Sequence, residues 1–403
     1  MNPKTLLIVF FSAVFSFSFY FSSITESFKF KSKDKIFYTD DMVIPHSAKT
    51  GNVNYFYPLI PPPQDTIPYL STFMDYATNG NTLKQLVVKG DTIIASCTYV
   101  DSAGAADPNN HNSLALTYNY SLNGGNTWGF TGRTRFTAES KSRFGDINML
   151  SRTTAVATGR FWNPPLNSTV RKPGASEDVI LGGGTFIETR LEGTLGYDLY
   201  SSVRADDNLA CIVKIPSSSA GGYDTIYYTT YAGTFSPLKV INVSSLNNNA
   251  CSYSIAASPI NANHLTAVYC YINEPNVNLV PATIVRTSTN GGVNWSNPVE
   301  IAPTGIINGD SSGCFWHEDI AYKPGTNECF VVFSTDNYAP SAGPDEYRKA
   351  FKICIWNQTL NGGLPVVIAD WHNVPILSNN DLFYRIRNFH INSRVVNHPS
   401  IGF

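Results

Sequence analysis

Short apolar runs separated by polar turns dominate the chain after Tyr69, and no 3.6-residue apolar period extends over a dozen residues. One arrangement occurs five times: an apolar strand, a turn rich in Gly, Asn or Asp, and a second apolar strand. The five copies are QLVVKGDTIIASCTY (85–99), INMLSRTTAVATGRF (147–161), SSVRADDNLACIVKI (201–215), YSIAASPINANHLTAVYCY (253–271) and EDIAYKPGTNECFVVFS (318–334). Each copy predicts a β-hairpin.

A second pair of strands follows several of these hairpins. Residues 114–130, 225–241 and 283–301 each combine a β-rich strand, a Gly-containing turn, an aromatic residue and a short strand. Four strands in a unit that recurs every 52 to 65 residues are typical of a β-propeller blade. HPSIGF (398–403) aligns with HEDIAY (317–322) and indicates a sixth unit. We therefore predict an all-β propeller with about five four-stranded blades and the start of a sixth, within which the chain is expected to be truncated. A β-sandwich array is the alternative.

The N-terminal part has a different composition. Residues 1–24 have a short basic start and an uncharged apolar run from Leu6 to Ile24, which predicts a secretory signal peptide. An uncleaved membrane anchor is the alternative. Residues 25–68 include PLIPPPQDTIP (58–68) and predict a Pro-rich linker or arm. The propeller domain is then expected at 69–403, and the protein is expected to be secreted or held at the cell surface, with no membrane contact after signal cleavage.

The charge balance bears on which classes of partner the protein can bind. Only 14% of residues are charged and the net charge is -2, so nothing indicates a nucleic-acid partner or an anionic membrane.

The chain has seven cysteines. Five of them lie in apolar runs and are expected to be buried free thiols: Cys97, Cys211, Cys270, Cys329 and Cys354. Cys251 and Cys314 precede strands and are the expected bridge if one exists. No Cys/His spacing supports a metal site, and no cofactor is predicted.

Two turns share the pattern S-x-N-G-G-x-[TN]-W. Their key residues are Ser121, Asn123, Gly125 and Trp128 in the first, and Ser288, Asn290, Gly292 and Trp295 in the second. The pattern resembles the Asp-box, or BNR repeat, of the sialidase superfamily, with Asn in place of Asp. An Asx side chain can bond the backbone of a tight turn, and glycine accepts positive φ. The resemblance implies that these residues are structural, and each Trp is expected to be buried against its own blade.

The resemblance also implies what a catalytic site would need: three arginines for a carboxylate, a Tyr–Glu pair as nucleophile and base, and an Asp. The family's arginine signature precedes the first box, whereas the nearest match here, around Arg385, follows the last box and lacks the family's Pro. Glu318 and Asp319 are the other catalytic candidates because they open an inner hairpin, where a channel mouth is expected. His317, Tyr347 and Arg348 are candidates for ligand binding.

These observations favour an exported propeller that binds a ligand, and a glycan is the expected class because Tyr and Trp are abundant and can stack on sugar rings. A sialidase-type exo-glycosidase and a structural surface protein are the alternatives. The expected partner is a carbohydrate or an extracellular protein. Because the arginine signature is out of place, we expect no hydrolysis of a fluorogenic sialoside.

Overall fold

The computed structural model describes residues 84–370 with internal gaps, together with 390–392 and 400–402. The gaps lie at 105–110, 131–132, 138–139, 152–153, 164–169, 193–197, 216–224, 244–249, 273–280, 303–304, 308–309 and 338–351. The expected signal peptide, the Pro-rich segment and the first residues of the expected propeller domain lie outside the described residues. In the described part, no helix is long and apolar enough to span a bilayer.

The described strands form five antiparallel sheets in chain order, followed by a two-stranded sheet. The first sheet contains β1 (Leu86–Lys89), β2 (Thr92–Tyr99), β3 (Ala115–Ser121) and β4 (Thr134–Arg135), and the second contains β5 (Ser142–Met149), β6 (Ala155–Trp162), β7 (Arg171–Asp178) and β8 (Phe186–Arg190). The third contains β9 (Leu199–Val203), β10 (Leu209–Ile215), β11 (Thr225–Tyr231) and β12 (Lys239–Val243), and the fourth contains β13 (Ala250–Ala257), β14 (Leu265–Ile272), β15 (Pro281–Ser288) and β16 (Val299–Ala302). The fifth contains β17 (Gly305–Ile307), β18 (Asp310–Tyr322), β19 (Cys329–Asn337), β20 (Lys352–Trp356) and β21 (Val366–Asp370), and the last pair is β22 (His390–Asn392) and β23 (Ser400–Gly402). Two short 3₁₀ segments, Ser102–Gly104 and Leu360–Gly363, are the helical elements of the described residues.

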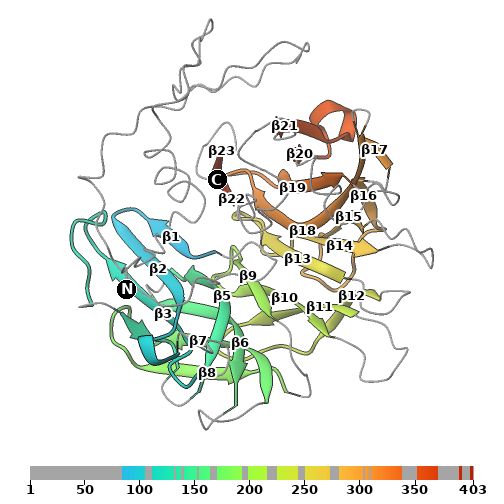
Figure 1. Ribbon diagram of the computed structural model, residues 1–403. Coiled ribbons are helices and arrows are strands. Elements are labelled where there is room, and N and C mark those ends of the chain that lie inside the picture. Colours follow the sequence, from blue (N-terminus) through green and yellow to red (C-terminus); the bar gives the residue numbers. More distant parts are fainter. Residues whose placement is uncertain are drawn as a thin grey trace, which may run out of the picture.

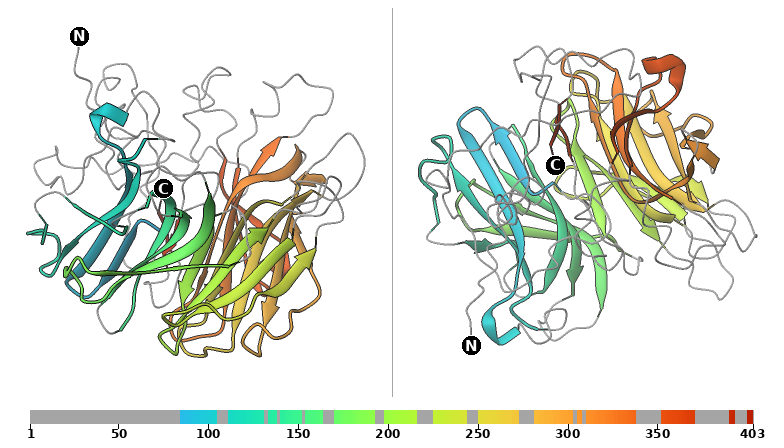
Figure 2. Two further views of the ribbon diagram at one scale, coloured as in Figure 1. Left: turned by 90° about the horizontal axis from the view of Figure 1, so that it is seen from below. Right: turned by 45° about the horizontal axis from the view of Figure 1, so that its top comes forward.

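The sheets follow one another around a common centre in chain order, as Figures 1 and 2 show. Their first long strands form the inner row, since β1 contacts β5, β5 contacts β9, β9 contacts β13 and β13 contacts β18. The pair β22–β23 lies beside β18 and β19, after the fifth sheet. This arrangement is a β-propeller with five blades and a two-stranded sixth sheet. The predicted fold class is confirmed, and all five predicted hairpins are present.

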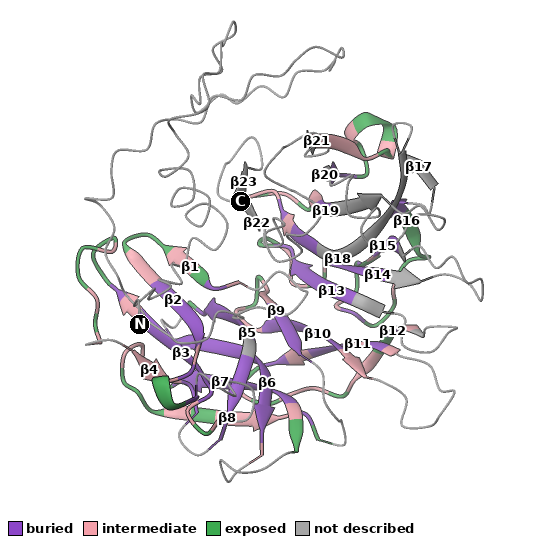
Figure 3. Ribbon diagram, in the orientation of Figure 1, coloured by how far each residue is buried: buried purple, intermediate pink, exposed green. Residues whose placement is uncertain are grey.

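The apolar core is divided into layers between neighbouring sheets. Ile94 and Tyr118 of the first sheet pack with Ile147 of the second, and further clusters lie mainly between the second and third, third and fourth, and fourth and fifth sheets. Figure 3 shows buried residues along inner and middle strands such as β2, β5, β6, β10 and β13, whereas the outer strands β8 and β16 carry exposed residues. A strand with a neighbouring sheet on both faces must be apolar on both faces, which explains the unbroken apolar run LACIV at the start of β10.

The cysteines differ partly from the expectation. Cys97, Cys211 and Cys354 are buried free thiols and Cys329 is a half-buried one. Cys270, however, is disulfide-bonded, so its assignment as a free thiol is wrong. The expected bridge between Cys251 and Cys314 lies outside what the structure describes, because neither side chain is described.

Candidate active site

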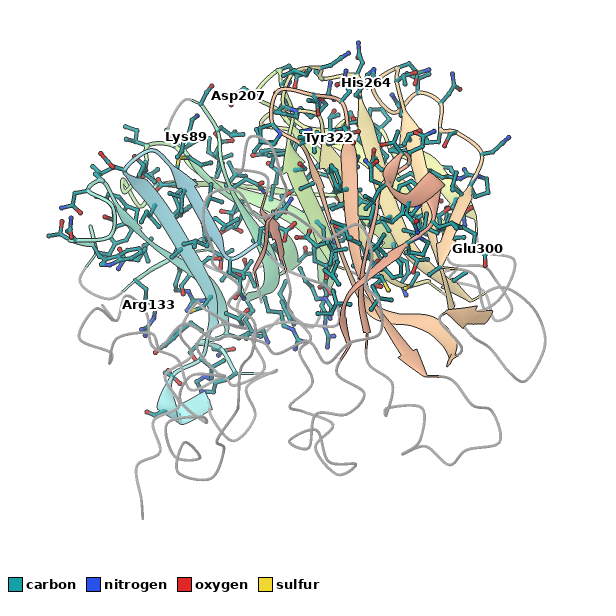
Figure 4. The ribbon with its side chains drawn as sticks, turned by 90° about the horizontal axis from the view of Figure 1, so that it is seen from above. Lys89, Arg133, Asp207, His264, Glu300 and Tyr322 are labelled. Atoms are coloured by element: carbon teal, nitrogen blue, oxygen red, sulfur yellow. The ribbon has the colours of Figure 1, made fainter. Side chains whose placement is uncertain are left out.

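The propeller has two distinct ends. Within each blade the first strand runs from the entering chain to a tight turn, so the β1–β2, β9–β10 and β13–β14 turns share one end. In Figure 4, Lys89, Asp207, His264 and Tyr322, which lie at or beside such turns, project from the same end. The connections from one blade to the next lie at the opposite end, here called the entry end. This topology brings the beginnings of all inner strands together.

Three of the inner strands carry a β-bulge near the entry end. The pairing of β5 with β6 shifts between Arg143 and Asp146, that of β13 with β14 shifts between Ala250 and Tyr253, and that of β18 with β19 shifts before Glu318. A bulge bends the strand, disrupts the ladder locally and re-aims side chains, and bulges are frequent beside active sites. Asp146 lies at the bulge of β5, and Glu318 and Asp319 lie at the bulge of β18. We call these three buried carboxyl groups the carboxylate cluster.

Glu318 is almost inaccessible, with 2% of its surface exposed. Its Oε2 accepts a hydrogen bond from the hydroxyl of Ser252, which lies in the β13 bulge. Its Oε1 has no partner at hydrogen-bond geometry, although the backbone N–H of Cys270 is close enough to lower the pKa of the carboxyl group. Burial outweighs these contacts and raises the pKa of Glu318 to about 8. Glu318 therefore carries a proton at neutral pH.

Asp319 interacts electrostatically with both other members of the carboxylate cluster. It is 3% exposed, and its charge raises the pKa of both Glu318 and Asp146. Successive residues of a strand point to opposite faces, so Asp319 emerges on the side of β18 opposite to Glu318. The two groups are thus held apart by the strand itself. Paired carboxyl groups with different environments can separate the tasks of a proton donor and a base or nucleophile.

Asp146 joins the first three blades. Its Oδ1 accepts a hydrogen bond from the backbone N–H of Lys84 at 2.8 Å and its Oδ2 accepts one from that of Ser201 at 2.9 Å. The Lys84 Nζ donates to the Ser201 carbonyl oxygen at 2.9 Å. Burial nevertheless raises the pKa of Asp146, and Asp319 raises it further. Sequence analysis missed Asp146. The signal was present, because Asp146 and Asp319 each lie three residues before the end of their inner strands.

A buried ion pair lies at the entry end of the second and third blades. The Arg160 guanidinium binds the Asp198 carboxylate through Nε–Oδ1 at 2.8 Å and Nη2–Oδ2 at 3.1 Å. Arg143 lies directly opposite Arg160 in the β5–β6 ladder. A sialidase-like site would need three arginines around one carboxylate, and the described residues give only this cross-strand pair. The fork of Arg160 is already engaged by Asp198, and Arg385 lies outside the described residues.

The remaining sequence candidates are not brought together by the described structure. Tyr347 and Arg348 lie outside the described residues, and His317 belongs to β18 but its side chain is not described. A Tyr–Glu contact does exist, from the Tyr231 hydroxyl to Glu177 Oε2 at 3.3 Å. It lies between blades at the turn end, away from the carboxylate cluster. No group of three or more His, Cys, Asp or Glu residues in the described part could hold a metal ion.

The two box-like turns have matching hydrogen bonds. In each, the Ser hydroxyl donates to the Asn Oδ1 (2.9 Å in the first, 3.0 Å in the second) and accepts from the N–H of the second glycine (2.9 Å in both). The Asn Oδ1 also accepts the N–H of the residue before the Trp, at 2.9 Å in both. All four glycines have positive φ, from 68° to 93°. Both turns thus satisfy the side-chain oxygens of their Ser and Asn residues internally.

The tryptophans differ from the expectation. Trp128 and Trp295 are half-buried. The Trp295 ring meets the Tyr228 ring of β11 edge to face, with centroids 5.7 Å apart. Tyr228 belongs to the preceding blade, so Trp295 joins two blades and does not pack solely on its own. A side chain at Gly292 would collide with the same tyrosine, at 2.2 Å from its ring.

Comparison with known proteins gives the fold alone. No family model matches the sequence, and no curated protein does. Similar solved structures include the α-L-arabinanase of Penicillium chrysogenum with arabinobiose (12% identity, 72% of this chain and 83% of that chain, TM-score 0.49). Others are the GH93 α-L-arabinofuranosidase of Fusarium graminearum (13%, 72% and 91%, 0.43) and a PL25 ulvan lyase (10%, 73% and 73%, 0.44). At these identities and TM-scores the likeness assigns no activity, and none of the comparisons confirms the sialidase resemblance.

Proposed function

We propose that the protein is a glycoside hydrolase of carboxylate type, with Glu318 as the general acid and Asp319 as the second carboxyl group. The observation that carries this proposal is the placement of Glu318, which is buried beside two β-bulges, with Oε2 bound by Ser252 and Oε1 lacking a partner at hydrogen-bond geometry; burial raises its pKa to about 8. A purely structural carboxyl group at this position would be expected to have both oxygens satisfied.

The chemistry follows from the two environments. Cleavage of a glycosidic bond requires a proton on the leaving oxygen, and a carboxyl group with a pKa near 8 still carries one at neutral pH. The second carboxyl group either activates water or attacks the anomeric carbon. Asp319 is assigned to this place because it is also buried and its charge raises the pKa of Glu318, so that the two carboxyl groups act on each other. Asp146, whose pKa is raised by burial and by Asp319, ties the second blade to Lys84 of the first and Ser201 of the third.

The test is release of reducing sugar or nitrophenol from a panel of polysaccharides and aryl glycosides that includes a sialoside. We expect turnover of a neutral glycoside and none of the sialoside. Glu318→Gln and Asp319→Asn should each lower kcat by at least about 100-fold, as loss of an acid or base catalyst does. Glu177→Gln, which alters a buried carboxyl group at the turn end, is the matched control and should retain activity.

The binding-module alternative makes a different prediction. If the wild-type protein binds a glycan without hydrolysing any member of the panel, and Glu318→Gln binds it equally well, the hydrolase proposal is wrong. Full activity in a folded Glu318→Gln variant would also overturn it. Circular dichroism of each variant separates loss of catalysis from loss of fold.

A further inference from the structure

Five tripeptides in the chain have the form Asn-x-Ser or Asn-x-Thr, the acceptor sequence for N-linked oligosaccharides. They begin at Asn119, Asn167, Asn242, Asn294 and Asn357. Such a sequence can be occupied in the folded protein only where the asparagine lies at the surface, because the attached oligosaccharide is large and hydrophilic. The structure therefore separates acceptors from sequences that only look like acceptors.

Two of the five are excluded by burial. Asn119 and Asn357 are 1% and 2% exposed. The Nδ2 of Asn119 donates to the Phe130 carbonyl oxygen at 3.1 Å, and that of Asn357 donates to the Cys329 carbonyl oxygen at 2.7 Å. Nδ2 is the atom that an oligosaccharide would occupy. A sugar at either position would break these bonds and displace packed strands.

Asn294 has the opposite surroundings. It lies in the turn between β15 and β16 and is exposed, and among the described residues its side chain makes no hydrogen bond. Its backbone N–H donates to Asn290 Oδ1 at 2.9 Å, which fixes the backbone while the side chain stays free. The adjoining Trp295 turns toward Tyr228, away from the solvent side of the turn.

The other box-like turn offers an internal comparison. It shares the Ser and Asn hydrogen bonds described above, but Thr127, whose hydroxyl accepts from Asn123 Nδ2, stands where the second turn has Asn294, and Gly129 stands where it has Ser296. The acceptor sequence is thus no requirement of the turn. Of the remaining two sequences, Asn242 is half-buried in β12 and Asn167 lies outside the described residues.

We propose that Asn294 is an N-glycosylation site whose donor is a lipid-linked oligosaccharide diphosphate. In the transfer, a bond forms between Nδ2 and the anomeric carbon, the bond from that carbon to the diphosphate oxygen breaks, and the lipid diphosphate leaves while Nδ2 loses one proton. The proposal rests on the export that the sequence predicts and is independent of the proposed hydrolase activity. Since Asn294 lies at the turn end, the oligosaccharide would leave the entry end of the inner strands uncovered.

The experiment is expression of the full chain in a eukaryotic secretory host, with peptide mapping of secreted and cell-associated protein together. Enzymatic deglycosylation in heavy-oxygen water should convert Asn294 into labelled Asp. Asn294→Gln and Ser296→Ala should each remove one oligosaccharide from the intact mass. Thr359→Ala, which destroys the buried sequence at Asn357, is the control and should leave the number of oligosaccharides unchanged.

Two results would overturn the proposal. One is unmodified Asn294 in both fractions, and the other is an Asn294→Gln variant with the mass change of the wild-type protein. Occupancy at Asn119 or Asn357 would show that the burial argument fails for this fold. Hydrolase activity is measured in parallel on the deglycosylated protein, so that failure of the glycan site and failure of the proposed function remain distinguishable.

Discussion

The box-like turns and the carboxylate cluster differ in where their polar side chains find hydrogen-bond partners. In the turn at 288–295 the Ser288 hydroxyl and the Asn290 side-chain oxygen each form hydrogen bonds with residues at most four positions away, close to the solvent. Around Glu318 the partners come from another blade, 66 residues away in the case of Ser252, and one carboxyl oxygen has no hydrogen bond.

This difference distinguishes residues that stabilise the fold from residues that are candidates for catalysis. A turn that uses its Ser and Asn oxygens for its own backbone lowers the free energy of the fold, and those oxygens are not available to a ligand. A buried carboxyl group with an open oxygen raises the free energy of the fold, and such a cost is usually retained where function needs it. The following changes test this contrast from both sides.

The largest expected effect is on the pH dependence of stability. Unfolded Glu318 ionises near 4.5, whereas folded Glu318 keeps its proton until about pH 8. Its contribution is therefore fully present below pH 4.5 and is lost as the pH rises to about 8. Across that range the wild type should lose up to about 1.4 kcal/mol per pH unit relative to Glu318→Gln.

The measurement is urea unfolding of the two proteins at a series of pH values. The shift of Asp146 has the same direction but is common to both proteins, so it cancels in the difference between them. Stability curves that run parallel from acid to alkaline pH would show that Glu318 is ionised in the fold, and its role as the proton donor would then be wrong.

A smaller loss is expected at Trp295. Because its ring is half-buried against Tyr228 of the preceding blade, Trp295→Ala should lower the free energy of unfolding by about 2 kcal/mol, below the range for fully buried tryptophans. Val293→Ala, three-fifths exposed in the same turn, is the control and should stay within about 0.5 kcal/mol of the wild type. Equal stabilities of the two variants would show that the interblade ring contact contributes nothing.

The smallest effects are expected at Asn290. Replacement by Ala removes the oxygen that accepts from the Ser288 hydroxyl and from the Asn294 backbone, and should cost about 1 kcal/mol. Asn290→Asp keeps that oxygen and should change stability by less than about 0.5 kcal/mol. Thermal unfolding of the pair decides the matter, and a loss on Asp substitution as large as that on Ala substitution would contradict the turn geometry.

The sequence predicts those parts of the fold that rest on local interactions. The five hairpins and the two turns follow from alternation, glycine and Asx residues within a span of about twenty positions. The same reasoning selected Glu318 and Asp319 as candidates, because they open a recognisable inner hairpin, and their role as site residues stays a prediction. Asp146 was missed because its partners, Lys84 and Ser201, are 62 and 55 residues distant.

Two further features could not be read from one sequence. The bulges in β5, β13 and β18 depend on how neighbouring blades pack, and they decide where Ser252 meets Glu318. The direction of Trp295 depends on the ring of Tyr228 in another blade. The expectation that this Trp packs on its own blade considered only the local turn, and it missed the contact with the preceding blade.

The contacts of Lys84 have a consequence for the order of folding. Its Nζ reaches Ser201, 117 residues later, and its backbone N–H reaches Asp146. During synthesis, the segment that leads into the first strand stays without both partners until the first strand of the third blade has left the ribosome. Contacts of such long range close slowly, because a large loop must be ordered first. The first blade is therefore expected to be the first made and among the last to become rigid, which hydrogen exchange on the refolding chain would reveal as late protection at Lys84.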